Sequence, residues 1–524
     1  MVRPNPFGPA NRAAPFQRDP PGGDAHGVPM TDSSLVLAAI LVPALGALIL
    51  PFIGRFSVQA RNWLAALLVL TAFIANVALF PSALGEGTSV SASLLGMRVV
   101  ADGLAVFVAA ASSLISLIIV IYSFDYIADH HRHDVHEAAA SGSNEPLIDH
   151  SNEYYMMVVL FLGSMMGLVY SGNLILLFLF WELTAVASWR LIGFFRKPTD
   201  IARANKAFLV TVFGALAMLL GFVMLWHEAG SFDLLQIKEK LGTTPISDLA
   251  LALIMAGILS KSATLPFHTW LPDAGVAPSP VTSLLHAAVL VKIGVYVFAR
   301  LFVATLTYSA LGHQMVLTLA AASALVSAGA ALVDTDLKRI IAYSTVSQIA
   351  FIFLGLAAGS HMAVTGALLY ILMHGLAKGG LFLCAGIVEN GTHSKDITKL
   401  GGLIKQMPVT AVSFLLCALS VMGVPPFGGF FSKTMVIAGA TEAGYPWISG
   451  VFVLGAFLTI IYLFRVYNLV FLGKVGVASK QEGSRTMVYS VAALALLSIV
   501  GGIAIHWPGM FAEAAVDQML GMVK

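Results

Sequence analysis

The sequence predicts an all-α membrane protein that crosses the bilayer about fourteen times. Of its 524 residues, 58% are hydrophobic and only 11% are charged, whereas about a quarter of the residues in a soluble domain are charged. Apolar runs long enough to span a bilayer as helices recur along nearly the whole chain. Membrane β-barrels show short alternating segments instead, and this sequence contains none. One continuous helical bundle therefore fits the sequence better than several soluble domains.

The chain opens with a polar extension, residues 1–29, which is rich in Pro, Gly and Arg and lacks the apolar core of a signal peptide. We expect this extension to be disordered, and Met30 is an alternative start. The stretch 231–241 is amphipathic and predicts a short surface helix. Fourteen membrane segments are expected near 33–53, 61–80, 103–127, 154–170, 172–194, 205–227, 248–266, 278–303, 314–333, 337–357, 364–388, 408–431, 448–472 and 486–506.

Two of the expected helices are interrupted. The seventh contains Pro266 near its middle, and the twelfth contains Pro425 and Pro426 followed by Gly428 and Gly429. Proline removes a helical hydrogen bond, and matched broken helices mark the ion sites of transporters built from inverted repeats. Pro and Gly are also commoner in membrane helices generally. The matched breaks favour two inverted five-helix repeats, 154–303 and 314–472, preceded by helices 1–3 and a His-rich loop in 30–153 and followed by a C-terminal helix and tail, 486–524.

The distribution of basic residues predicts the orientation of the helices. Loops after odd-numbered helices carry most of the lysines and arginines, namely Arg55, Arg61, Arg196, Lys197, Arg203, Lys395, Lys399, Lys405, Lys474, Lys480 and Arg485. Because basic loops stay on the cytoplasmic side, we expect both termini to lie outside a bacterial-type inner membrane.

Several classes of function are disfavoured by the same sequence. Cys384 and Cys417 lie in apolar helices without a CxxC motif or a Cys/His cluster, so no iron–sulfur centre or structural zinc is expected. The sequence lacks the Gly-rich phosphate-binding loop that would indicate ATP-driven transport. A net charge of +2 does not suggest binding to nucleic acid. The segment 128–153 is expected to be a solvated loop, not a metal site. It nevertheless carries five histidines: His130, His131, His133, His136 and His150.

Titratable side chains inside the apolar segments are the strongest functional signal. A charged side chain at the bilayer centre costs about 2.5–3.5 kcal/mol on insertion scales. Such residues usually face the bundle interior or water and mark an ion or proton path. In this sequence they are Glu182, Lys261, His286, Lys292, Lys338, His374 and Lys378, with Lys433 close to the second break.

The spacing of these residues suggests how protons could move between them. Glu182 and Lys261 would form an ion pair when together, and apart the lysine could release its proton, although a static buried pair is the alternative. One helix face carries Tyr370, His374 and Lys378 at i, i+4 and i+8. Polar side chains that could hold water between relay members are Ser344, Thr345, Ser347 and Gln348.

Two further basic residues are less clearly part of this path. Lys206 lies at a helix start, where it could either join the path or extend to the interface. Arg190 stays charged under ordinary conditions, so it is expected to anchor the bundle rather than carry protons.

Five stretches between about 150 and 435 carry a family resemblance. They are FWELTAVASWRLIGF, SKSATLPFHTWLPDAGVAPSPVTSLLHAAVLVKIGVY, DTDLKRIIAYSTVSQIAFIFLGL, LLYILMHGLAKGGLFLCAGI and GVPPFGGFFSK. In their order and spacing they resemble the antiporter-like membrane subunits of respiratory complex I, which are shared with Mrp-type cation/proton antiporters and group 4 membrane-bound hydrogenases. The resemblance implies two inverted five-helix repeats around a hydrated central axis.

The resemblance also implies a role for each position. Glu182 matches the gating glutamate and Lys261 its partner lysine, while Lys433 matches the terminal residue that exchanges protons with the outside. The central relay would consist of His286, Lys338, His374 and Lys378. This sequence departs from the family pattern at Tyr370, where some members have a second histidine, and at Arg190, in a usually apolar stretch. Lys292 is typical of the antiporter and hydrogenase branches.

From these features we expect a redox-cofactor-free, proton-translocating subunit of a complex I-like NADH:quinone oxidoreductase. NADH, quinone and other redox centres would then bind to partner subunits of this translocase complex. The alternatives are a subunit of an Mrp-type cation/proton antiporter and the membrane subunit of a group 4 energy-converting hydrogenase, because the same path serves all three. A purely structural anchor would not need the two breaks and the buried charges. The expected partners are other membrane subunits and the lipid bilayer, with no nucleic acid.

Overall fold

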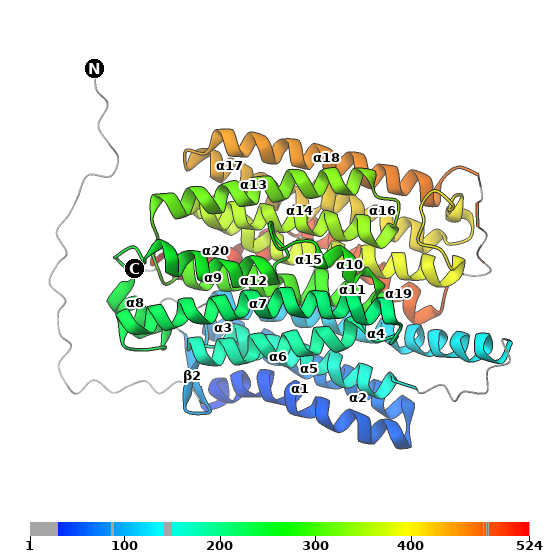
Figure 1. The fold of residues 1–524 in the computed structure, drawn as a ribbon, viewed down its shortest axis with the longest axis horizontal. Coiled ribbons are helices and arrows are strands. Elements are labelled where there is room, and N and C mark those ends of the chain that lie inside the picture. Colours follow the sequence, from blue (N-terminus) through cyan, green and yellow to red (C-terminus); the bar gives the residue numbers. More distant parts are fainter. Residues whose placement is uncertain are drawn as a thin grey trace.

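The computed structural model describes residues 30–84, 89–140, 149–474, 476–477, 479 and 482–522, with the side chains of Met30 and of 133–140 left out. The extension 1–29, which we expected to be disordered, lies outside the described residues. Within them, long helices run side by side to form one elongated bundle (Figure 1).

Twelve of the described helices are long and apolar enough to cross a membrane, so the chain is a multi-pass membrane protein. They are α1 (Met30–Phe56), α2 (Val58–Ala78), α4 (Gly103–Ala140), α5 (Ser151–Tyr170), α6 (Leu174–Ile192), α7 (Pro198–Ala229), the continuous stretch Ser279–Val303, α13 (Ala310–Val333), α14 (Leu337–Ala358), α15 (His361–Thr392), α18 (Pro446–Phe471) and α19 (Arg485–Ile503).

The stretch Ser279–Val303 changes its helical form along its length. It consists of α11 (Ser279–Ser283), the π-helix η2 (Leu284–Ala288), α12 (Leu290–Phe298) and the π-helix η3 (Ala299–Val303). π-helical turns are rare and frequently occur at functional sites. Here they bracket the part of the chain that carries Lys292.

The seventh and twelfth segments are divided, as predicted. The seventh consists of α9 (Asp248–Lys261) and α10 (Trp270–Asp273), and the twelfth of α16 (Pro408–Met422) and α17 (Gly428–Glu442). Together with the twelve continuous helices they give the fourteen expected segments. Their boundaries differ from the prediction, because α9 already ends at Lys261 and leaves Pro266 in the break, while α17 continues well beyond the expected end at 431.

Four shorter elements were not predicted. The strands β1 (Val90–Leu94) and β2 (Met97–Ala101) pair antiparallel through a two-residue turn, in which Leu95 and Gly96 both have positive φ, the geometry that tight hairpins favour. The helix α3 (Phe80–Ala83) precedes this hairpin, and α20 (His506–Leu520) packs against α4 and α15. The predicted surface helix is present as α8 (Leu234–Leu241), and short 3₁₀ turns occur at η1 (Ala274–Val276) and η4 (Leu403–Lys405).

The expected loop 128–153 is in large part helical, which corrects the prediction. α4 continues to Ala140 because no Gly or Pro interrupts it, and it projects beyond the bundle at the right of Figure 1. The His130 ring is stacked on that of Tyr126, with the centroids 6.5 Å apart, and is tilted against that of Phe195, with the centroids 4.3 Å apart. Within the described residues, no group of three or more His, Cys, Asp or Glu side chains could hold a metal ion; the side chains of His133 and His136 lie outside this description.

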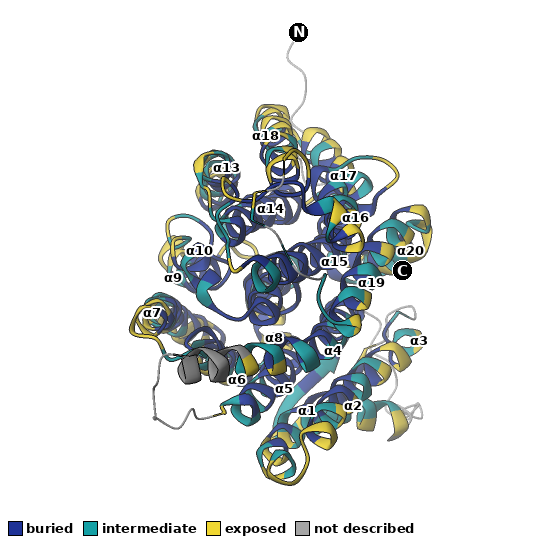
Figure 2. Cartoon of the chain, turned by 90° about the vertical axis from the view of Figure 1, so that its right-hand side faces the viewer, coloured by how far each residue is buried: buried dark blue, intermediate teal, exposed yellow. Residues whose placement is uncertain are grey.

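Burial divides the helices into a central and a peripheral set. The stretch Ser279–Val303 is buried throughout and α14 and α15 almost so, whereas two thirds of the most apolar windows of α1 and α18 remain uncovered. Viewed along the bundle, α14 and α15 lie in the middle (Figure 2). The uncovered helices are apolar because lipid, not water, is their expected solvent. The central set carries the buried side chains of Lys292, Lys338, His374 and Lys378.

One ion pair joins the start of η3 to Asp102, the residue that follows β2. The guanidinium of Arg300 donates two hydrogen bonds to the carboxylate of Asp102, one of them 2.7 Å long, and it also donates to the Tyr296 hydroxyl at 2.9 and 3.1 Å. Burial raises the pKa of the Asp102 carboxyl, but the charge and hydrogen bonds of Arg300 outweigh burial and hold this pKa below its usual value. The pair thus persists at neutral pH.

We expect Asp102→Asn to lower the free energy of unfolding by about 3 kcal/mol, because it leaves the largely buried Arg300 charge without its counterion. Thermal unfolding in detergent at pH 7 measures this loss, with the exposed Glu239→Gln as control. A carboxyl with a lowered folded-state pKa stabilises above its unfolded pKa and loses that contribution as the pH falls. The difference in the free energy of unfolding between wild type and variant should therefore become smaller only below about pH 4. Equal stability of the two proteins at pH 7 would contradict a stabilising role for the Asp102–Arg300 ion pair.

Candidate functional site

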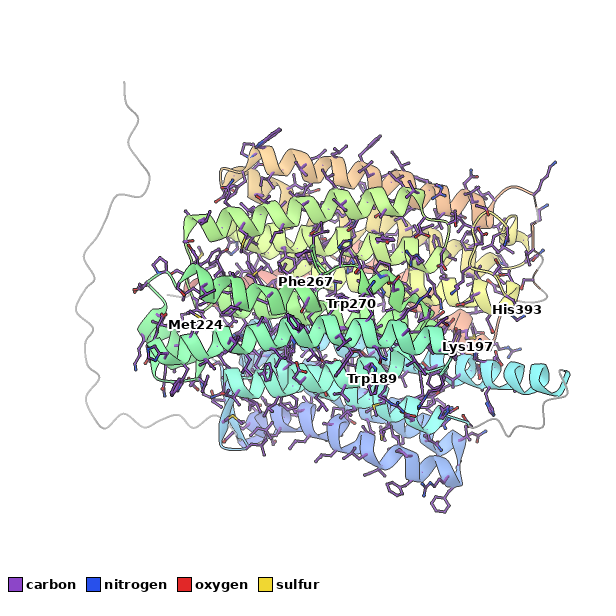
Figure 3. All side chains as sticks on the ribbon, viewed as in Figure 1. Trp189, Lys197, Met224, Phe267, Trp270 and His393 are labelled. Carbon is purple, nitrogen blue, oxygen red and sulfur yellow. The ribbon has the colours of Figure 1, made fainter. Side chains whose placement is uncertain are left out.

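Lys261 lies at the last residue of α9, where the first break begins, and is completely buried. A cation is favoured at this position because the carbonyl end of a helix carries partial negative charge. The ammonium nitrogen donates to the backbone carbonyl of Trp181 at 3.0 Å and lies 5.2 Å from the centre of the Trp181 ring. The break is fastened by Trp270, whose indole nitrogen donates to the Ser260 carbonyl at 2.9 Å; Figure 3 shows Phe267 and Trp270 about midway along the bundle.

Glu182, the expected partner of Lys261, lies next to Trp181 on α6. Its Oε1 atom is buried and has no hydrogen-bond partner, and within the described chain no ion pair joins it to Lys261. The two charges are nevertheless close enough to interact electrostatically. The structure therefore holds the pair in its separated arrangement, with the lysine bonded to the backbone beside the acid.

A lysine–histidine contact occupies the centre of the bundle. The Lys292 Nζ atom lies 2.5 Å from Nδ1 of His374, and this contact joins α12 to α15. From sequence, Lys292 was only a supporting residue typical of certain branches; the structure places it directly on the expected relay. His286, on η2, interacts electrostatically with both His374 and Lys292.

Three imidazole nitrogens in this region are buried without a protein partner: Nε2 of His374 and both ring nitrogens of His286. Buried polar atoms are nearly always hydrogen-bonded to protein or water. Each of these nitrogens can therefore make a further hydrogen bond, which a group that passes protons needs.

Lys378 continues the line along α15, one turn after His374. Its ammonium donates to the Ile341 carbonyl at 3.1 Å and, at short range, to the Ser344 hydroxyl. One turn before His374, the Tyr370 hydroxyl donates to Gln348 at 2.6 Å. The predicted stripe is therefore present, and it faces α14.

Of the four polar side chains expected to hold water on α14, two contact the stripe and two do not. Ser344 and Gln348 are its direct partners. Ser347 instead donates to the Ala324 carbonyl of α13 at 2.9 Å, and Thr345 donates to the Ile341 carbonyl of its own helix at 3.1 Å.

Lys433 lies on α17 just after the second break and is buried. Its ammonium donates to the Val421 carbonyl at 2.6 Å, one of the last carbonyls of α16, which the interrupted helix leaves without an intrahelical partner. It lies 4.6 Å from the ring centre of Phe351 and 5.6 Å from that of Tyr370. Tyr370 therefore connects Lys433 to the stripe on α15. The breaks around Pro266 and Pro425 each place one lysine in the bundle interior.

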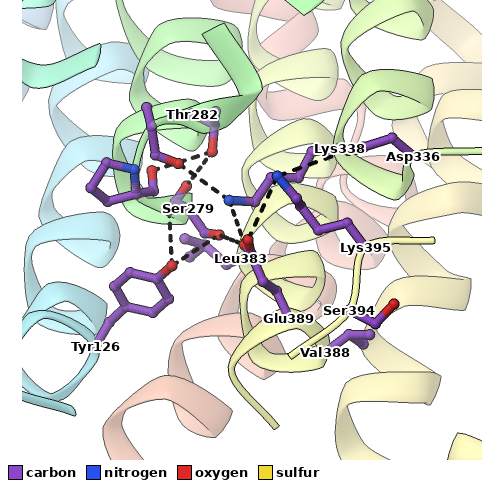
Figure 4. A network of polar contacts seen from close by, with 12 residues as sticks. Tyr126, Ser279, Thr282, Asp336, Lys338, Leu383, Val388, Glu389, Ser394 and Lys395 are labelled. Carbon is purple, nitrogen blue, oxygen red and sulfur yellow. Dashed lines mark hydrogen bonds and ion pairs between the residues drawn. The ribbon is translucent and has the colours of Figure 1, made fainter. Parts of the chain in front are cut away.

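Lys338 is bonded to an acid that the sequence analysis missed. Its ammonium lies 2.5 Å from the carboxylate of Glu389 and donates to the Ala277 carbonyl at 3.2 Å (Figure 4). Glu389 was overlooked because the eleventh helix was expected to end at 388, whereas α15 continues to Thr392. The spacing in the sequence could have identified this acid. Glu389 follows Lys378 by eleven residues, about three helical turns, and therefore lies on the same helix face.

Lys206 and Arg190 belong to networks at the basic-loop end, where Figure 3 shows Lys197 and His393. Lys206 pairs with Asp273 at 2.7 Å, and Asp273 also binds Arg339 at 2.8 Å. Arg190 and Arg196 both pair with Glu153. Among the described residues, no hydrogen bond or ion pair joins either network to the central line, so the structure places Lys206 and Arg190 beside that line.

The central line offers chemistry of one kind. Its members are groups that can gain or lose a proton, they lie on helices around the two breaks, and three imidazole nitrogens among them have no protein partner within the described residues. Such an arrangement can pass protons from group to group along the membrane interior.

Comparison with known proteins bears on the family. Residues 171–459 match the family model described as "NADH:quinone oxidoreductase/Mrp antiporter, TM". The Na(+)/H(+) antiporter subunits A1 of Staphylococcus saprophyticus and Staphylococcus haemolyticus are both 32% identical, over 94% and 92% of this chain. The chain spans about three fifths of these relatives, 63% and 62% of their lengths.

Three solved structures share the fold. The Mrp complex from Dietzia sp. DQ12-45-1b gives a TM-score of 0.81 at 20% identity, covering 94% of this chain and 98% of the other. The membrane-bound sulfane sulfur reductase, an archaeal respiratory membrane complex, gives a TM-score of 0.80 at 21% identity, covering 94% of this chain and 100% of the other. Respiratory complex I from Thermus thermophilus with bound NADH gives a TM-score of 0.77 at 22% identity, covering 93% of this chain and 100% of the other. The expected family resemblance is confirmed: this chain belongs to the NADH:quinone oxidoreductase/Mrp antiporter transmembrane family.

Proposed function

We propose that this chain carries the proton half of a cation/proton exchange, as a membrane subunit of an Mrp-type antiporter. The observation that carries the proposal is the set of largely buried titratable residues in the interior around the two breaks, with Lys292 and His374 in direct contact. It consists of Glu182, Lys261, His286, Lys292, His374, Lys378 and Lys433, with Lys338 at its side. The similarity to Na(+)/H(+) antiporter subunits over more than nine tenths of this chain favours this branch over the complex I-like oxidoreductase.

In this proposal, the Glu182 and Lys261 pair controls proton movement along the line. When the two are apart, as in the structure, the Lys261 ammonium has only a carbonyl and an aromatic face as partners. It can then give its proton through water to the central bases. When Glu182 approaches, the ion pair holds the proton on the lysine. Moving between these two arrangements would gate the line.

The central contact lets the proton change helices. A hydrogen bond between the Lys292 and His374 nitrogens needs a proton on one of them and a lone pair on the other. Transfer from a Lys292 ammonium to a neutral His374 leaves a neutral amine and an imidazolium. The charge then lies on α15, from which Lys378 and, past Tyr370, Lys433 can receive it. Lys433 would release the proton on the side opposite the basic loops.

The membrane setting follows from the same proposal. The basic loops would face the cytoplasm of a bacterial-type inner membrane, with both termini outside. The partners would be other membrane subunits, and any redox centre of a related oxidoreductase complex would bind to those subunits and not to this chain.

The test uses the complete complex in membrane vesicles, with ΔpH followed by a fluorescent dye after addition of sodium. Glu182→Gln and Lys261→Ala are each expected to reduce the ΔpH response to background while the protein remains inserted, and Glu228→Gln, at an exposed acid on α7, should leave it unchanged. Wild-type exchange in both relay variants would contradict the proposed path. A response to NADH but not to sodium would support the complex I-like alternative instead.

A further inference from the structure

The ion pair between Lys338 and Glu389 differs in setting from the rest of the line. The other interior lysines bond to backbone carbonyls, a hydroxyl or an imidazole, whereas Lys338 contacts a carboxylate at 2.5 Å. The side chain of Lys338 is 2% exposed and that of Glu389 is 28% exposed. One ion pair therefore joins the buried interior to the surface at the basic-loop end.

The pair also leads inward. Lys338 begins α14, and Ser344 lies six residues further along the same helix, about 9 Å of rise. Ser344 and Ile341 are the two partners of Lys378. A proton that reaches Lys338 is thus one short, serine-lined step along α14 from the central stripe.

Charged and polar groups surround Glu389 on its other sides (Figure 4). Lys395 lies 3.9 Å from the second carboxylate oxygen and equally far from Asp336. Ser279, on α11, donates its hydroxyl to Glu389 at 3.4 Å, and Tyr126, on α4, contacts Ser279. Tyr122, Tyr126 and His130 of α4 interact with Glu389 electrostatically. The acid lies between a buried lysine and a partly exposed one.

We propose that Glu389 loads protons into the line from the basic-loop side, and that Lys338 is the first buried acceptor. This inference rests on the proposed function. A proton from the aqueous phase binds the Glu389 carboxylate and removes its attraction for Lys338. Once Lys338 has passed its own proton inward to a neutral Lys378, the Glu389 carboxyl gives its proton to the neutral Lys338 amine. The products, a carboxylate and an ammonium, re-form the observed ion pair.

The competing role for this pair is static, holding the start of α14 against the end of α15. The two roles predict different results in a charge exchange. A static pair tolerates Lys338→Glu combined with Glu389→Lys, because attraction is preserved. A loading residue does not, because the acid then lies in the interior and the lysine at the surface.

The experiment measures sodium-driven ΔpH in vesicles of the complete complex, with the pH varied separately on the basic-loop side. Glu389→Gln should slow transport by about tenfold or more, and Glu389→Asp should keep measurable transport with an altered dependence on the pH of that side. The matched control, Glu442→Gln at the exposed end of α17, should behave as wild type. Insertion and oligomeric size are checked by size-exclusion chromatography.

A second readout does not depend on transport. Infrared difference spectra recorded across the pH range should show a protonated-carboxyl band in wild type that disappears in Glu389→Gln and remains in the Glu442→Gln control. Wild-type transport in Glu389→Gln, or full recovery in the charge exchange, would overturn the loading role. The proposed function itself fails only if Glu182→Gln and Lys261→Ala also retain exchange, so the two failures are distinguishable.

Discussion

Replacing Lys378 by Met is expected to stop proton movement and at the same time to raise the stability of the folded protein. Lys378 is completely buried, and its ammonium contacts only a backbone carbonyl and a hydroxyl. A buried charge without an opposite charge destabilises a fold, whereas a well-packed apolar side chain of similar size does not. Functional residues commonly carry this kind of penalty.

Little else should change in the Lys378→Met variant. Ser344 keeps a hydrogen bond to the Ile341 carbonyl at 2.9 Å, so the substitution leaves no polar partner stranded. We expect a gain of about 1 kcal/mol in the free energy of unfolding and a loss of about 100-fold or more in proton transport.

Thermal unfolding in detergent and the vesicle ΔpH assay measure the two effects of Lys378→Met separately. Lys405→Met, at an exposed lysine near η4, serves as control and should alter neither. If transport survives in Lys378→Met, the stripe on α15 is not the route; if stability falls sharply, Lys378 holds the core together instead.

The second large effect concerns folding. Gly429 is the second residue of α17, and a Cβ atom there would lie 1.9 Å from the carbonyl oxygen of Ser420 and 2.8 Å from its carbonyl carbon. Both are backbone atoms of α16, so no side-chain rotation relieves the clash. Overpacking commonly lowers the free energy of unfolding by about 1–3 kcal/mol. Because the clash is with backbone atoms, we expect the loss in Gly429→Ala to reach or exceed the upper end of this range.

Fluorescence-detected size-exclusion chromatography should show little folded Gly429→Ala protein. The matched control is Gly450→Ala on α18, where a Cβ atom would meet nothing within 4 Å. Alanine favours helix over glycine by up to about 1 kcal/mol, so the control should fold at least as well as wild type. Equal yields of the two variants would show that α16 and α17 can move apart at the break.

Much of the architecture could be read from the sequence, because the length of an apolar run decides whether it spans a membrane. The two breaks were equally visible, since proline interrupts any helix. The hairpin and the extension of α4 were not, because polar segments between membrane helices carry no such length requirement. The boundaries at Lys261 and Gly428 depend on how the chain repacks around each break, which the positions of Pro266 and Pro425 do not fix.

For the site, the residue types were predictable and their pairing was not. Helical spacing placed Tyr370, His374 and Lys378 on one face, but it could not identify the opposite face. The Lys292–His374 contact joins residues 82 positions apart, and only packing brings them together. Lys261 was expected to pair with the carboxylate of Glu182. Its ammonium instead contacts the backbone carbonyl of Trp181, the residue before Glu182, and charge alone does not suggest this partner.

The excess of lysine over carboxylate in the interior has a consequence for ion selectivity. A sodium ion needs several oxygen ligands, preferably anionic, in place of its hydration shell. The line instead presents ammonium groups and imidazoles, with only Glu182 in its midst and Glu389 already engaged by Lys338. A bare metal cation would be repelled wherever these lysines are protonated, while a proton is stored by them. If sodium crosses the membrane in exchange, we expect it to use a carboxylate-lined route in another subunit, leaving this bundle to conduct protons alone.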